Sequence, residues 1–142
     1  MKISLVNSLE VDKKIVDEHK EKLEAMGHEF IVYNDNAKND DELANRLEDT
    51  DIAIITNKPL SANVIDKAKN LEMIDVAFTG VDHIDLNAVK ENGITLLNAS
   101  GYSDDSVAEL VIGLTIAVMR KFNENRENIF DGQNNNLMGE PI

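Results

Sequence analysis

Short apolar runs recur along the first hundred residues, and apolar positions at helical spacing follow each run. The run at residues 52–55 has no polar alternation, which is typical of a strand buried on both faces. Gly27 and Gly93 stand where a residue just after a helix end is expected. The pattern predicts strands at residues 3–6, 30–33, 52–55, 74–77 and 94–97, and helices at residues 12–26, 40–47, 85–92 and 104–122, with one more helix that begins at Ser61.

Five β–α units with buried strands predict an α/β fold with a mostly parallel, doubly wound sheet. We expect five strands in the flavodoxin-like order 2-1-3-4-5, with helices on both faces, and this order rests on the connection rules alone. The predicted division is a domain at residues 1–103, a long helix at 104–122, and a linker or loose tail at 123–142, a segment rich in asparagine.

The predicted helix at residues 104–122 is apolar on nearly all sides. Such a helix needs to be covered on more than one side. We expect it to self-associate or to fold back onto the sheet edge, and the alternative is an ordinary crossover helix of a self-contained domain.

Composition narrows the function classes. The chain has 142 residues, with 14 Lys and Arg against 27 Asp and Glu, so its formal charge is −13. That balance argues against nucleic acids and anionic membrane surfaces as partners. Cysteine is absent from the sequence, which excludes disulfides and thiolate metal sites. The first residues do not form a signal peptide and no apolar run is long enough for a membrane span, so we expect a cytoplasmic protein.

The loop at residues 79–85 directly follows the fourth predicted strand. Backbone amides at Gly80 and Val81 would lie at the carboxyl edge of the sheet, where open α/β folds bind ligands. Two successive free amides suit a carboxylate or phosphate oxygen. The alternative is a turn that needs glycine for its backbone angles alone.

Other chemistries have less support. Asn57 and Lys58 follow the third predicted strand and either line the same cleft or belong to a solvated loop. Histidine spacing gives no metal site. A phospho-receiver needs carboxylates at the ends of the first and third strands, and an FMN binder needs a hydroxyl-rich and glycine-rich first loop; the sequence has neither.

Four segments, in this order, resemble the amino-terminal part of the NAD-dependent D-isomer-specific 2-hydroxyacid dehydrogenases. They are residues 55–60 (ITNKPL), 79–85 (TGVDHID), 93–98 (GITLLN) and 101–109 (GYSDDSVAE). Within that family the chain looks nearest to the glycerate or hydroxypyruvate type, or to the D-3-phosphoglycerate type. The family transfers a hydride between nicotinamide and C2 of a small 2-hydroxy or 2-oxo acid.

The resemblance implies site residues for this chain. Thr79, Gly80 and Val81 would bind the substrate carboxylate, with Asn57 and Lys58 at the mouth of the cleft. Tyr102 would close one wall of the pocket or pack between domains. Asn98 would lie at the interdomain hinge and contact the nicotinamide side, with an ordinary turn residue as the alternative.

The resemblance also implies that some functional parts of the family enzyme are not in these 142 residues. The family's catalytic arginine, histidine and glutamate, and its glycine-rich dinucleotide fingerprint, would follow position 142, so the chain looks truncated and carries no catalytic residue. We therefore expect NAD to belong to the longer enzyme, this chain alone to be inactive, and a homodimer to form through the 104–122 helix. A non-catalytic module that binds small carboxylates or a partner protein is the alternative.

Overall fold

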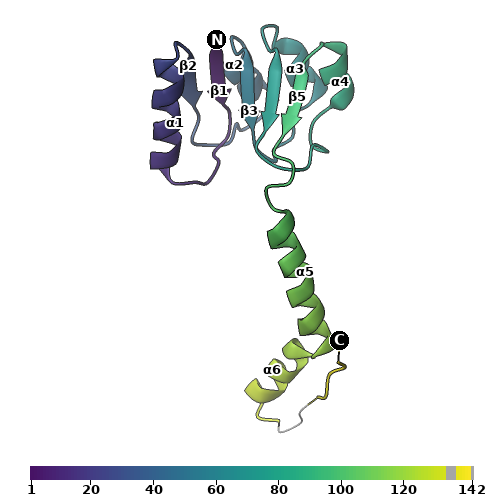
Figure 1. Cartoon of the computed structure of the whole chain (residues 1–142). Helices are drawn as coiled ribbons and strands as arrows, with labels where there is room; N and C mark the ends of the chain where they lie inside the picture. Colours follow the sequence, from purple (N-terminus) through teal and green to yellow (C-terminus); the bar gives the residue numbers. More distant parts are fainter. Residues whose placement is uncertain (134–136, 142) are drawn as a thin grey trace. The chain divides into compact units, whose positions relative to one another are not determined.

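The computed structural model describes residues 1–133 and 137–141 and divides the chain into two compact units, Met1–Ser100 and Gly101–Ile142. The first unit is a β–α alternation (Figure 1). Its elements are β1 (Lys2–Leu5), α1 (Lys13–Ala25), β2 (Glu29–Val32), α2 (Asp40–Leu47), β3 (Ile52–Ile55), α3 (Ala62–Lys67), β4 (Met73–Val76), α4 (Leu86–Glu91) and β5 (Thr95–Asn98).

All five strands form one parallel sheet in the order β2-β1-β3-β4-β5, which confirms the predicted order. Leu5 is opposite Ile54 between β1 and β3, and Val76 is opposite Asn98 between β4 and β5. Parallel strands need crossover connections, so the loops after β1, β3 and β4 all emerge at the same carboxyl edge. This edge is where the candidate site lies.

Alternate strand residues face opposite sides of the sheet, and helices cover both sides as predicted. On one side α1 packs through Val16 and Leu23 against Ile3, Leu5 and Phe30. The larger core lies on the other side, beneath α2, α3 and α4. It includes Val6, Leu43, Leu47, Ala53, Ile55, Val64, Ile65, Ile74, Val76 and Val89. Each fully buried Leu, Ile or Val contributes about 1.5–3 kcal/mol, so this larger core is the main source of the unit's stability.

Side-chain hydrogen bonds cap the first turns of α2 and α4 but not that of α3. Asn39 Oδ1 accepts from the Glu42 amide at 2.9 Å, and Asp85 Oδ1 accepts from the Ala88 amide at 3.0 Å. Ser61 precedes α3 as predicted, but its side chain makes no capping hydrogen bond. Its hydroxyl donates instead to the carboxylate of Asp40, a stronger acceptor than a neutral group.

The second unit contains α5 (Asp104–Met119) and α6 (Phe122–Phe130). The helix expected to run to residue 122 ends at Met119, because Lys121 takes a left-handed φ of 51° that a continuous helix does not allow. α6 begins one residue before the 123–142 segment, for which a linker or loose tail was expected, and extends into it as far as Phe130. Residues 134–136 of that segment are outside the described part. Asn125 in α6 holds the backbone at Leu137, since its Oδ1 accepts from the Leu137 amide at 2.8 Å.

α5 has no buried residue. Its apolar side chains are largely exposed, for example Val118 at 75% and Ile112 at 61%. Among the described residues, no helix has the length and apolar content needed to cross a bilayer.

Candidate functional site

Two loops are joined at the carboxyl edge of the sheet. One follows β3 and carries Asn57 and Lys58; the other follows β4 and carries residues 79–85. An isolated parallel bridge links Leu60 to Ile84. Its hydrogen bonds run from the Leu60 amide to the His83 carbonyl at 2.9 Å and from the Asp85 amide to the Leu60 carbonyl at 3.0 Å. The bridge fixes the two loops relative to each other.

Two successive backbone donors of the second loop, the amides of Gly80 and Val81, are free. Within the described part of the chain, no hydrogen bond has the amide of Gly80 or Val81 as its donor. Gly80 is exposed and Val81 is half-buried. Free amides at the surface are hydrated, so a ligand oxygen can replace the water without breaking a protein contact.

The loop is also tied to the neighbouring strand. Asn98, the last residue of β5, donates from Nδ2 to the Thr79 carbonyl oxygen at 2.7 Å. One residue later, the Ala99 amide donates to the Phe78 carbonyl at 3.2 Å. These contacts hold the backbone that leads into Gly80, and they give Asn98 a local structural role within the first unit.

Neither the conformation of Gly80 nor its packing requires glycine. Its φ lies outside the left-handed region, and a Cβ built there would meet only Asp82 Oδ2, at 3.9 Å. The alternative that the turn needs glycine for its backbone angles is therefore wrong here. The missing Cβ leaves open space beside the two free amides.

Asn57 and Lys58 line a small pocket beside this loop, with a volume of about 190 Å³. The remaining lining residues come from the loops after β1 and β2 and from the ends of β3 and β4. They are Ser8, Leu9, Glu10, Asn36, Thr56 and Phe78. Phe78 stands two positions before Gly80, so the pocket adjoins the loop with the free amides.

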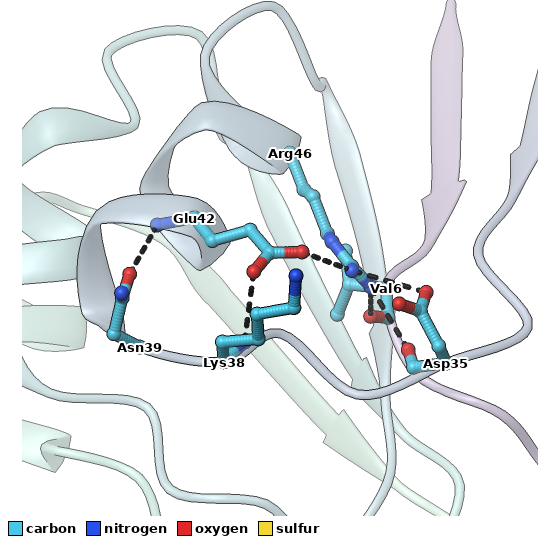
Figure 2. A network of polar contacts seen from close by, with 6 residues as sticks. All are labelled: Val6, Asp35, Lys38, Asn39, Glu42 and Arg46. Atoms are coloured by element: carbon cyan, nitrogen blue, oxygen red, sulfur yellow. Dashed lines mark hydrogen bonds and ion pairs between the residues drawn. The ribbon is translucent and has the colours of Figure 1, made fainter.

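Arg46 fixes two of the segments that border this pocket (Figure 2). Although charged, its side chain is only 6% exposed. Its Nη1 donates to the Val6 carbonyl at 3.0 Å and to the Asp35 carbonyl at 2.9 Å. Its Nη2 bonds Asp35 Oδ1 at 3.0 Å and Glu42 Oε1 at 2.6 Å. The guanidinium also lies 4.4 Å from the Tyr33 ring centroid.

The same network perturbs Glu42. A hydrogen bond from the Lys38 amide, and then one from Arg46, lowers the pKa of the Glu42 carboxyl below its ordinary value. The buried role of Arg46 was not predicted from the sequence, although its position in the sequence indicates one. It lies between Leu43 and Leu47 on the apolar face of α2, where a cation must find partners.

Tyr102 belongs to the second unit, and its side chain is 63% exposed. Its expected role beside the substrate therefore stays a prediction. No cluster of three or more potential metal ligands occurs among the described residues. None of the seven glycines in the sequence begins a G-x-G-x-x-G pattern, the fingerprint of dinucleotide-binding folds.

Comparisons with known proteins agree with this architecture. Residues 8–138 match the family model described as "D-isomer specific 2-hydroxyacid dehydrogenase, catalytic domain". Glycerate dehydrogenase of Methylorubrum extorquens is 34% identical over 114 residues, which cover 76% of this chain and 36% of the relative. The chain thus spans about a third of that relative's length.

Two solved structures are also similar to this chain in fold. An acyclic imino acid reductase in complex with NADPH and D-Arg has a TM-score of 0.83 at 30% identity, covering 99% of this chain and 45% of that one. The NAD-dependent formate dehydrogenase from Staphylococcus aureus, in complex with NAD, has a TM-score of 0.79 at 30% identity, covering 95% and 43%. The matched residues, the sheet order and these relatives together establish that the chain belongs to the D-isomer-specific 2-hydroxyacid dehydrogenase family, within its catalytic domain.

Proposed function

We propose that this chain binds the carboxylate of a small 2-hydroxy or 2-oxo acid at the Gly80 and Val81 amides, as the substrate-binding part of an NAD-dependent dehydrogenase. One observation carries the proposal: two consecutive amides at the surface have no partner in the described chain, beside a glycine that the fold itself does not need. A carboxylate oxygen accepts from two such donors, and the absent Cβ lets it approach.

Each neighbouring residue has a distinct part in this proposal. Thr79 carries the carbonyl through which Asn98 holds the loop, so Asn98 is a positioning residue for the amides. Asn57 and Lys58 lie at the rim of the cleft, where the ammonium group favours approach of an anion to an otherwise acidic chain. Tyr102 keeps the role that the family resemblance implies, contact with the substrate in the longer enzyme.

The redox chemistry belongs to the nicotinamide, which supplies or accepts the hydride when it is bound. The solved relatives with NAD and NADPH support this assignment, while this chain's residues bind and orient the acid. The family resemblance places the arginine, histidine and glutamate of the reaction outside these 142 residues, so we expect the chain to be inactive by itself.

A titration of the ¹⁵N-labelled chain with glyoxylate tests the binding step. The expected result is a saturable shift of the Gly80 and Val81 amide signals, with α3 and α4 unaffected. Acetamide, which resembles a small carboxylate but is neutral, is the control ligand and should leave both signals unchanged. Absence of any glyoxylate shift at these two amides would overturn the proposal.

An assay with NADH tests whether the chain alone can complete the reaction. The chain alone should bind glyoxylate equally with and without NADH and should reduce none of it. NADH-dependent turnover by the purified chain would show that its catalytic machinery is complete, contrary to the proposal. Binding without turnover is also what a non-catalytic carboxylate module would show. NADH-dependent turnover by this chain combined with a dinucleotide-binding part is the measurement that distinguishes the two classes.

A further inference from the structure

A second pocket lies between α1 and the ends of β1 and β2, on the side of the sheet that α1 covers (Figure 1). Its volume is about 310 Å³. Leu5 of β1, Val32 of β2 and Val16 of α1 form an apolar floor, and all three belong to the smaller core. Because the pocket opens directly onto this core, it can bury the aliphatic part of a ligand.

Charged side chains stand around this floor, and the fold uses only some of their charges. Lys13 and Asp17 form an ion pair with each other, so their charges are already compensated. Lys20 pairs only with Glu24, at 3.6 Å and at an exposed position. Exposed pairs of this kind contribute little to stability, so the Lys20 ammonium group is available to a ligand anion.

Glu10 supplies the opposite charge from the loop after β1. Its carboxylate has no hydrogen bond or ion pair among the described residues, although its amide donates to Ser8 Oγ at 3.2 Å. The backbone of Glu10 has a left-handed φ of 55°, a conformation that favours glycine and strains other residues. A strained residue whose side chain does nothing for the fold indicates a functional role for that side chain.

The two available charges limit the class of ligand. Glu10 disfavours a phosphate or a dicarboxylate, and Lys20 disfavours a polyamine. A small zwitterion satisfies both groups, with its ammonium group at Glu10 and its carboxylate at Lys20. The amide of Asn34, also without a partner in the described part of the chain, can bond to either end of such a ligand.

The apolar floor and the volume define the rest of the ligand. A volume of about 310 Å³ is equivalent to roughly ten water molecules, close to the number of non-hydrogen atoms in leucine. A polar side chain would lose its water against Leu5, Val16 and Val32 without gaining a hydrogen bond from them. An aliphatic side chain gains from the same burial.

We propose that this pocket binds a free α-amino acid with an aliphatic side chain, at a site separate from the carboxylate site at Gly80 and Val81. Glu10 binds the ammonium group, Lys20 binds the carboxylate, and the side chain packs on the floor formed by β1, β2 and α1. The inference does not depend on the proposed dehydrogenase function, because it uses neither the loop after β4 nor the cofactor.

A matched set of ligands tests the site. L-Leucine has both charges, 4-methylpentanoate lacks the ammonium group, and 3-methylbutylamine lacks the carboxylate. Titrated into the ¹⁵N-labelled chain, leucine should shift the amide signals of Ser8, Glu10 and Asn34 saturably and leave those of Gly80 and Val81 unchanged. Each of the other two ligands loses one charge-assisted contact and should bind at least tenfold more weakly than leucine.

Variants assign the two charges. Glu10→Gln should weaken leucine binding at least tenfold without weakening that of 4-methylpentanoate, and Lys20→Met should weaken leucine binding without weakening that of 3-methylbutylamine. Glu21→Gln and Lys22→Met, at exposed positions of α1 away from the pocket, are the matched controls and should change neither affinity.

A further variant separates binding from folding. Glu10→Gly suits the left-handed φ, so its Tm should equal or exceed that of the wild type while its leucine affinity falls at least tenfold. Equal affinities of the wild type for leucine and its two single-charge analogues would overturn the zwitterion site. Leucine shifts confined to Gly80 and Val81 would overturn it as well, because leucine would then bind only as a carboxylate.

Discussion

The side-chain amide of Asn98 donates a 2.7 Å hydrogen bond to the carbonyl oxygen of Thr79, which joins the last residue of β5 to the loop that carries the two free amides. The Thr79 carbonyl precedes the Gly80 amide in the same peptide unit. The hydrogen bond from Asn98 therefore sets the direction of the Gly80 N–H, the first of the two proposed donors, as well as the position of the loop.

Asn98→Ala removes this contact and leaves the loop attached through the Ala99 amide. Because one neutral hydrogen bond is lost at an exposed position, the free energy of unfolding should fall by about 1 kcal/mol or less. Glyoxylate binding should weaken several-fold, since the amides lose their fixed direction. Calorimetry and the amide titration measure the two effects. Asn63→Ala, at an exposed position on α3, is the control, and an unchanged affinity in Asn98→Ala would contradict the positioning role.

Gly80→Ala separates folding from ligand approach. The added methyl group meets only a carboxylate oxygen at 3.9 Å and φ is not left-handed, so the native state accommodates alanine. Loss of glycine's freedom in the unfolded chain should leave stability unchanged or raise it by about 0.4–1 kcal/mol. Glyoxylate binding should nevertheless fall at least tenfold, because the methyl group obstructs the amides.

The matched control for Gly80→Ala is Gly113→Ala. This helical glycine in α5 also has open space where a methyl group would be added, and its φ is not left-handed. The control should leave glyoxylate affinity unchanged. A Gly80→Ala chain that binds glyoxylate normally would show that the ligand does not approach this backbone.

Arg46→Met should destabilise the fold and loosen the pocket together. The substitution keeps the apolar stem but leaves the buried Val6 carbonyl without its donor and frees the Asp35 segment. We expect the free energy of unfolding to fall by about 2–3 kcal/mol. Lys67→Met is the control: the Lys67–Asp41 pair is 48% and 82% exposed, and such surface pairs are worth about 0–1 kcal/mol. Equal effects of the two substitutions in urea unfolding would contradict the network's role.

The pKa of Glu42 makes part of the stability depend on pH. Its folded-state pKa is lowered, first by the Lys38 amide and then by Arg46, so the unfolded state binds the proton more readily. This contribution is complete above the ordinary value of 4.5 and is lost as the pH falls through the lowered folded-state pKa. Glu42→Gln should flatten this part of the acid-unfolding curve, whereas Glu48→Gln should not. Identical curves below pH 4.5 for wild type and Glu42→Gln would contradict it.

The fold follows from the sequence more completely than the site does. Doubly buried strands joined by helices admit few topologies, so the connection rules sufficed for the order β2-β1-β3-β4-β5. The strand-to-loop pattern predicted free amides at Gly80 and Val81, but only the structure could exclude a nearby carbonyl as their partner. Arg46 was missed since its partners are main-chain carbonyls of Val6 and Asp35, which have no sequence signature. α6 was missed because its asparagine-rich segment has low helix propensity.

Self-association through α5 is the last prediction. The apolar side chains of this helix are exposed on several sides, and an exposed apolar surface of this kind favours association in water. We expect the sedimentation coefficient of the chain to rise with concentration. Leu114→Glu with Val118→Glu places two charges one turn apart at positions 56% and 75% exposed, and should weaken association at least tenfold. Glu109→Gln, on the same helix, should leave it unchanged. A wild-type chain that sediments as a monomer at all concentrations would rule out this helix as an interface, because association that depends on apolar area has to grow with protein concentration.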